Sequence, residues 1–93
     1  MKNQDGVHDN KAESRFELRV AGETAIAAYE REGGVICFTH TVVPEAIEGR
    51  GVGSRLIAAA LAVARAEHLK VVPQCPFVAA YIAKHPESAE LAD

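Results

Sequence analysis

The chain has 93 residues, of which 48% are hydrophobic and 25% charged, and its formal charge is −3. This length limits it to one domain with a modest core, so residues 1–93 are treated as a single unit. The negative charge argues against a nucleic-acid-binding protein, and no apolar run approaches the roughly 20 residues that a membrane span needs. The polar first ten residues also lack the apolar segment of a secretory signal peptide.

Alternating side chains predict a half-buried antiparallel strand near the start of the chain. Phe16, Leu18 and Val20 fall on one face, and charged residues fall on the other. Turns around Gly22 and Gly33 then predict two hairpins, and therefore three strands that run antiparallel. The expected segments are a frayed start over residues 1–6, a short edge segment over 7–10, and strands over 13–20, 24–31 and 35–43.

The third strand, residues 35–43, differs from the first because both of its faces are largely apolar. Such a strand is typical of a position inside the sheet with cover on both sides. Pro44 ends the strand, and a turn-rich connector follows over residues 44–54. An alanine-rich helix is expected over residues 55–68.

The last third of the chain predicts one more strand and one more helix. Residues 70–72 should pair parallel to the third strand, because a helical crossover separates the two. Pro73 and Pro76 cannot donate hydrogen bonds to a neighbouring strand, so pairing should fail there. A short helix is expected over residues 77–84. The predicted architecture is an α+β fold with a mixed sheet: three antiparallel strands, a helix, a parallel strand and a short C-terminal helix.

Cysteine and histidine placement bears on redox compartment and metal binding. Cys37 and Cys75 lie far apart and form no C-x-x-C pair, so we expect free thiols in a reducing, cytoplasmic compartment. The histidines lack the spacing of metal ligands, so we expect no metal. These histidines are His8, His40, His68 and His85.

A glycine loop, Glu48-Gly49-Arg50-Gly51-Val52-Gly53, separates the third strand from the long helix. Glycine lets the backbone approach a ligand closely, and the first free N–H groups of a helix carry the positive end of its dipole. We therefore predict a diphosphate site at this loop. A Walker-type P-loop would need Lys-Ser or Lys-Thr where the chain has Ser54-Arg55, and a dinucleotide fingerprint would need a third glycine at Ser54. A flexible loop without a ligand is the other alternative.

The loop resembles the acyl-CoA loop of the GNAT superfamily of N-acyltransferases, whose pattern is R/Q-x-x-G-x-G/A. Gly51 and Gly53 match the second half of this pattern, whereas Glu48 stands where the superfamily usually has Arg or Gln. The resemblance extends from about Phe16 to the end of the chain, and over this range the sequence is similar to a small, single-domain GNAT-like family. The matching residues outside the loop are Thr39-His40-Thr41, Val43-Pro44, Cys75-Pro76-Phe77-Val78, Tyr81 and His85-Pro86-Glu87.

This resemblance implies a minimal GNAT fold that binds acetyl-CoA and transfers its acetyl group to a primary amine of a small molecule or a protein lysine. The arm of CoA would lie in a gap between the third strand and the strand after the helix. The turn at residues 21–23 has no room for the extra helices that often build the acceptor site, so that side should be open and shallow. A non-catalytic CoA-binding module or acyl-CoA sensor is the alternative. The residues expected to contact CoA are Val42, Val43, Arg50, Gly51, Val52, Gly53, Ser54, Cys75 and Tyr81.

Three residues are candidates for catalysis, each with a structural alternative. Cys75 is placed nearest the thioester, either as a nucleophile or as a small residue lining the channel. His40, expected on the same face as Phe38 and Val42, is either a general base or a histidine hydrogen-bonded across the sheet. Tyr81 stands where many GNAT enzymes place a tyrosine that protonates the CoA thiolate, and its alternative is a packed helix tyrosine.

Overall fold

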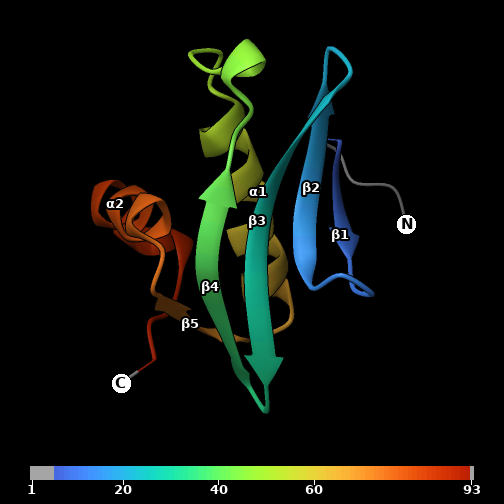
Figure 1. Ribbon diagram of the computed structural model, residues 1–93. Helices are drawn as coiled ribbons and strands as arrows, with labels where there is room; N and C mark the ends of the chain where they lie inside the picture. Colours follow the sequence, from blue (N-terminus) through green and yellow to red (C-terminus); the bar gives the residue numbers. More distant parts are fainter. Residues whose placement is uncertain (1–5, 93) are drawn as a thin grey trace.

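The computed structural model describes residues 6–92, and the expected frayed start lies outside this part of the chain except for Gly6. It confirms the predicted α+β class, with a mixed five-stranded sheet and two α-helices in the described part (Figure 1). The elements are β1 (Val7–Asn10), β2 (Arg15–Val20), β3 (Glu23–Glu32), β4 (Val35–Val42), the short 3-10 helix η1 (Glu45–Ile47), α1 (Val52–Ala66), β5 (Lys70–Pro73), α2 (Pro76–Lys84) and the 3-10 helix η2 (Pro86–Ser88).

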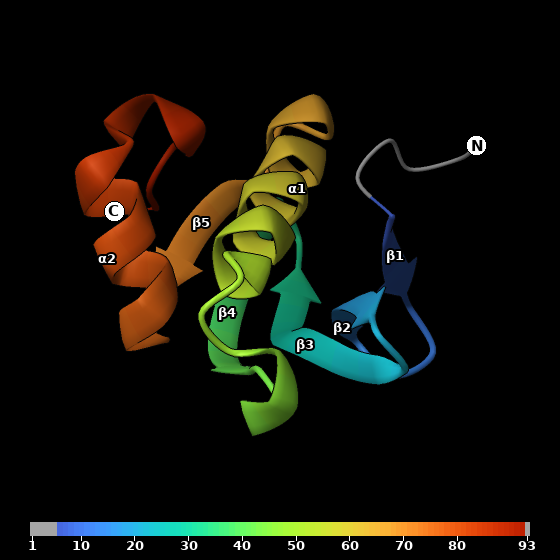
Figure 2. The same cartoon turned by 90° about the horizontal axis from the view of Figure 1, so that it is seen from above.

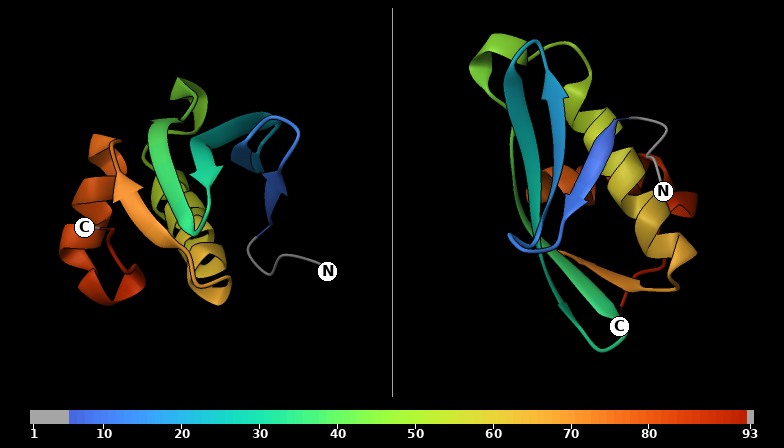
Figure 3. Two further views of the ribbon diagram at one scale, coloured as in Figure 1. Left: turned by 90° about the horizontal axis from the view of Figure 1, so that it is seen from below. Right: turned by 90° about the vertical axis from the view of Figure 1, so that its right-hand side faces the viewer.

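The strands lie in the sheet in chain order, from β1 to β5. The first four strands pair antiparallel, and β5 pairs parallel to β4, as the two hairpins and the helical crossover predict. Helix α1 begins three residues earlier than predicted and packs along one face of the sheet (Figures 2 and 3). Its buried stripe fills the core with the sheet residues Phe16, Leu18, Ile36 and Phe38. In residues 6–92 no helix is long and apolar enough to cross a bilayer.

Strand β4 lies inside the sheet, but the prediction that both of its faces are covered is wrong. Ile36 and Phe38, on the face toward α1, are each 1% exposed. Val35 and Cys37, on the opposite face, are only half-buried. An apolar pattern shows which residues tolerate burial, but the one long helix in residues 6–92, α1, covers a single face of the sheet. The second face of β3 and β4 is therefore open to solvent.

Strand β4 also contains a β-bulge at Thr39. Tyr29 pairs with Phe38 and the preceding residue of β3, Ala28, pairs with His40, so Thr39 is an extra residue on β4. Paired residues of neighbouring strands point to the same face. His40 therefore points to the open face with Val42, and the prediction that it shares a face with Phe38 is wrong.

The residue after His40 points the other way. Thr41 pairs with Ala27, which is fully buried on the face toward α1. The bulge thus returns the end of β4 to the α1 side, where Val43 packs against the core.

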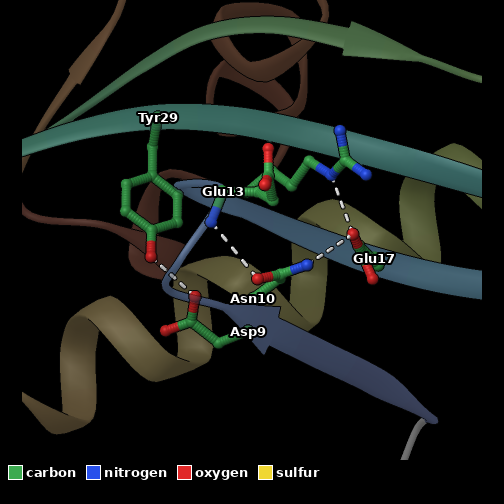
Figure 4. A network of polar contacts seen from close by, with 6 residues as sticks. Asp9, Asn10, Glu13, Glu17 and Tyr29 are labelled. Atoms are coloured by element: carbon green, nitrogen blue, oxygen red, sulfur yellow. Dashed lines mark hydrogen bonds and ion pairs between the residues drawn. The ribbon is translucent and has the colours of Figure 1, made fainter.

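A polar network fastens the edge strand β1 to the rest of the sheet (Figure 4). The Tyr29 hydroxyl reaches across β2 and donates a hydrogen bond of 2.6 Å to Asp9 Oδ1. Glu17 Oε2 accepts hydrogen bonds from Asn10 Nδ2 at 3.0 Å and from Arg15 Nε at 2.7 Å. These two bonds, with that to Arg15 the stronger, lower the pKa of the Glu17 carboxyl. A strand of four residues is thereby held by side chains as well as by its backbone pairing.

The end of the chain returns to the sheet and covers the outer edge of β5. Val71 N–H donates to the Glu90 carbonyl at 2.8 Å, and Ala92 N–H donates to the Val71 carbonyl at 2.9 Å. Pairing of this kind removes an exposed strand edge that would otherwise be available to other chains. The sequence pattern did not predict this contact.

Candidate functional site

Strands β4 and β5 separate at the end of the sheet nearest the start of α1. Their parallel pairing runs from Val35 with Lys70 to Phe38 with Pro73. A last hydrogen bond, of 2.9 Å, joins Cys75 N–H to the Phe38 carbonyl. Beyond Phe38, the described register pairs the rest of β4 with β3. The proline positions predict this break, because neither proline has an N–H to donate.

The start of α1 presents free backbone donors beside this break. Gly49 and Gly51 have left-handed backbone conformations, with φ of 83° and 72°, which glycine adopts without strain. Gly51 is the N-cap and has no side chain to bond the first-turn N–H groups of the helix. The first intrahelical bond at this end joins Arg55 N–H to the Gly51 carbonyl. The donors of Val52 and Gly53 thus have no partner within the helix, which suits an anion.

A pocket of about 420 Å³ lies between the end of β4 and the start of α1. Five of the predicted CoA-contact residues line it, all from the end of β4 or the first turn of α1. They are Val43, Gly51, Val52, Gly53 and Ser54. The chemistry of this lining fits an anion such as a diphosphate with an extended chain attached, because backbone donors stand beside apolar side chains.

Two other predicted contact residues, Val42 and Arg50, are not among the residues that line the pocket. Val42 is 49% exposed and belongs to the open face of the sheet. Arg50 is exposed, and its neighbours Gly49 and Gly51 line the pocket without it. A long arginine side chain on the loop remains able to reach a bound phosphate, so its role stays a prediction.

Two further residues shape the pocket that the sequence did not single out as contacts. Glu48 is one of the residues that line the pocket, and its negative charge would oppose an anion. Phe77 is 42% exposed and lies so close to Gly53 that a Cβ atom built on the glycine would fall 2.7 Å from the ring. Phe77 is part of the recognised motif, but its contact with α1 depends on how the two helices pack.

Cys75 is buried directly beside the point where β4 and β5 separate. Its side chain is 3% exposed, and its Sγ is 3.3 Å from Thr41 Oγ1, which lies on the pocket wall. Cys75 is also the N-cap of α2, directly before Pro76. Thiol and hydroxyl therefore share a hydrogen bond next to the space where the end of an inserted arm would arrive.

His40 is a residue of β4 and points to the open face of the sheet. Its side chain is exposed, and its Nδ1 lies 3.3 Å from Thr39 Oγ1. The Thr39 hydroxyl is also 3.3 Å from the Ala28 carbonyl, to which it donates. The bulge thus places the Thr39 hydroxyl beside the His40 imidazole. It also places His40 on the face of β4 opposite to the Thr41–Cys75 pair.

Tyr81 lies in a second, smaller pocket of about 260 Å³ between the two helices. Its ring packs against His85, with the ring centroids 4.5 Å apart and the planes tilted by 37°. Ser54 and Phe77 line both this pocket and the first one, so the two hollows adjoin. The structure does not bring Tyr81 into the lining of the pocket beside Thr41.

Comparison with known proteins identifies the family. The model of the GCN5-related N-acetyl-transferase family matches residues 15–91. Protein NATD1 of Gallus gallus is 34% identical over 82 residues, which cover 85% of this chain and 74% of that protein. Protein NATD1 of Homo sapiens is 31% identical over 83 residues, which cover 86% of this chain and 74% of that protein. The chain belongs to the GCN5-related N-acetyltransferase family.

Proposed function

We propose that the protein binds acetyl-CoA and transfers the acetyl group to a primary amine. The observation that carries this proposal is the coincidence, at one pocket, of a strand break and a helix start with free donors. An extended polar ligand with a diphosphate at one end suits both features. Family membership supports the acyl donor.

The first-turn N–H groups of α1 would hold the diphosphate, as helix N-termini hold anions in other proteins. The arm would lie along the free edge of β4, where it would bond the strand as an added β-strand does. Its thioester end would then reach the region of Thr41 and Cys75, which share a hydrogen bond at the pocket wall.

Direct attack by the amine is the route that the arrangement favours. The amine nitrogen forms a bond to the thioester carbonyl carbon while the C–S bond breaks, and the leaving thiolate takes a proton from water at the open pocket. Because His40 lies on the other face of β4, the amine would reach the thioester from the open face of the sheet, through the gap between β4 and β5, and His40 would accept the proton that the ammonium must lose before it attacks. A backbone N–H of β4 beyond Phe38 would polarise the carbonyl oxygen.

Cys75 is better suited to lining the channel than to forming an acyl-enzyme. Its thiol is almost completely buried and shares a hydrogen bond with Thr41. His40, the candidate base, lies on the opposite face of the strand, away from the thiol. A thiol without a nearby base is a weak nucleophile, because the thiolate is the reactive form.

Turnover of a mixture of primary amines and lysine peptides with acetyl-CoA, followed by mass spectrometry, tests the proposal. We expect acetylated product, and a loss of about 100-fold in kcat for His40→Gln, since a positioned base contributes about that much. Cys75→Ala should retain turnover near the parent rate. Trapping of an acetylated Cys75 that the amine then discharges would instead show the covalent route.

A non-catalytic CoA-binding module is the second candidate. Among residues 6–92, the open face of β3 and β4 has no helix over it that would position an acceptor, and the charge of Glu48 would weaken binding of an anion. Tight binding of CoA without turnover of any amine would favour this role. We propose a cytoplasmic location, because Cys37 and Cys75 are free thiols and a reducing compartment keeps them so.

A further inference from the structure

A row of three side chains crosses the open face of the sheet at the level of His40. Ala28 of β3 pairs with His40 of β4 on one side and with Arg15 of β2 on the other. Paired residues of neighbouring strands point to the same face, so all three side chains stand on the open face. The row therefore places a cation on the face from which the amine would approach, with the small Ala28 side chain between that cation and His40.

The Arg15 side chain is held in place by neighbours on the same face. Its Nε donates to Glu17 Oε2 at 2.7 Å, and Asn10 Nδ2 donates to the same oxygen at 3.0 Å (Figure 4). Within residues 6–92, the two terminal nitrogens of the guanidinium make no hydrogen bond, and the side chain is 37% exposed. A guanidinium fixed through Nε presents its terminal N–H groups as a fork, which suits a carboxylate that accepts two hydrogen bonds.

The charges around His40 suit a ligand that carries both signs. Glu30 is exposed and pairs with Cys37, so its carboxylate stands on the open face, diagonal to His40. It attracts an ammonium group toward the candidate base, while the Arg15 guanidinium attracts an anion on the other side of Ala28. An acceptor with a positively charged amine at one end and a negative group at the other matches this arrangement.

The spacing of the strands gives the acceptor a length. From β2 to the gap between β4 and β5 is two and a half strand spacings, or about 12 Å. A hydrogen bond of about 3 Å to the guanidinium leaves about 9 Å for the acceptor itself. An extended 6-aminohexanoate is about this long. Its carbon chain would lie over Ala28, beside the apolar side chains of Ile26 and Val42 in the next row.

We propose that the acceptor is a small ω-amino acid, whose carboxylate is bound by Arg15 on the open face while its amine enters the gap beside His40. This inference rests on the proposed acetyl transfer. It gives Arg15 a part in substrate specificity in addition to its contact with Glu17. A lysine inside a protein chain has no carboxylate of its own at this distance from its amine and would be the poorer acceptor.

Steady-state kinetics with acetyl-CoA and two matched acceptors, 6-aminohexanoate and its amide, tests the proposal. The amide has the same amine and chain without the charge, so the ratio of the two kcat/KM values reports on the carboxylate contact. This acid-to-amide ratio should fall about tenfold in Arg15→Gln, the loss of one charge-assisted contact. Arg15→Lys retains the charge without the fork and should show a smaller fall.

Arg19→Gln is the matched control. Arg19 is an exposed arginine on the same strand and face, but it pairs with Thr24, two rows away from the row of His40. The acid-to-amide ratio should therefore stay at the parent value in this variant. Circular dichroism of each variant establishes that it is folded.

The length of the acceptor has a readout that needs no variant. In the parent protein, the acid-to-amide ratio should be about tenfold for 6-aminohexanoate and close to one for 3-aminopropanoate, whose chain is too short to reach both Arg15 and the gap. Intrinsic reactivity is calibrated by the uncatalysed reaction of each amine with acetyl-CoA.

The outcomes separate this inference from the acetyl transfer on which it rests. An acid-to-amide ratio near one for 6-aminohexanoate in the parent, or an unchanged ratio in folded Arg15→Gln, would overturn the ω-amino acid acceptor while acetyl transfer stands. If the parent protein acetylates no amine at all, the acetyl transfer is rejected, and this inference is rejected with it.

Discussion

Gly53 and Phe77 meet where the two pockets adjoin, and their contact sets the shape of both. The glycine lies in the first turn of α1 and is buried, and the phenylalanine ring occupies the space that a Cβ atom would need. Glycine is a poor helix former, by about 1 kcal/mol relative to alanine in a helix interior. Its presence here therefore has a packing reason.

Gly53→Ala should consequently have different effects on stability in two backgrounds. With Phe77 present, the new methyl group must displace the ring, which offsets the gain in helix propensity. In a Phe77→Ala background the space is empty, so Gly53→Ala should stabilise the protein. Urea unfolding of the four proteins should give a coupling of about 1 kcal/mol or more, within the range for residues in contact. Equal effects in both backgrounds would show that the ring does not restrict position 53.

Glu48 is a carboxylate at a site proposed for an anion. Glu48→Gln removes this repulsion, so the affinity for CoA should rise by about two- to fivefold at low ionic strength, an effect typical of exposed charges. The gain should shrink as salt is added, because the Debye length falls to about 10 Å at 0.1 M. Calorimetry at two salt concentrations measures both. Glu13→Gln, the same charge change on the turn after β1, is the control and should leave affinity unchanged.

If Glu48→Gln and Glu13→Gln behave alike at low salt, then the carboxylate at position 48 does not face the phosphates.

The turn conformation next to Glu48 was predictable from the sequence, because Gly49 and Gly51 readily adopt the left-handed φ that the structure shows. The ring of Phe77 was not, because its contact with α1 joins segments that are distant in sequence.

Strand β4 illustrates at the level of an element what a sequence pattern omits. Its apolar residues and its ending at Pro44 predicted a central strand, and Pro73 at the end of β5 and Pro76 after it predicted the break in pairing. The bulge at Thr39 was not predictable from alternation, since the extra residue is defined only by the pairing with β3. That single residue decides which face His40 and Thr41 occupy, and therefore how the candidate base stands to the thiol.

Strand β1 depends on the hydrogen bond between Tyr29 and Asp9. Burial, and then this bond, raise the pKa of the Tyr29 hydroxyl. The folded protein therefore keeps the proton at a pH where an unfolded tyrosine, with a pKa of about 10, has lost it. The unfolded state binds fewer protons there, so the free energy of unfolding falls as the pH rises above about 10.

Tyr29→Phe should make this alkaline loss of stability shallower by up to about 1.4 kcal/mol per pH unit, the contribution of one proton. At neutral pH the variant should be about 1 kcal/mol less stable, because the half-buried Asp9 loses its donor. Urea unfolding between pH 8 and pH 11 measures both effects. Tyr81→Phe, at the half-buried helix tyrosine, is the control. An unchanged alkaline slope in Tyr29→Phe would mean that the hydroxyl is not held protonated by folding.

At the scale of the whole molecule, the main architecture has two layers, the sheet and the long helix α1 on one of its faces. One long helix covers one face of the sheet, and the other face of β3 and β4 is left to solvent (Figures 2 and 3). The short turn between β2 and β3 predicted an open acceptor side, because it leaves no room for further helices. The return of the last residues to β5 was not predictable, since residues 89–92 carry no strand pattern.

An open acceptor side has a consequence for selectivity. Discrimination between substrates requires contacts that differ between them in the transition state. With few walls around His40, the proposed enzyme would select its acyl donor far more strongly than its amine. The pocket at the start of α1 would account for the first property, and the open face of the sheet would account for the second.

Amide chemical-shift mapping with CoA tests the central claim most directly, because it reports on the backbone N–H groups themselves. We predict that the largest shifts fall on Gly51, Val52, Gly53 and Ser54, with a second group at the end of β4 around Thr41 and Val43. Phosphopantetheine should reproduce both groups of shifts. Saturating CoA that leaves these amides unmoved, or that moves only residues on the open face of the sheet, would contradict the account.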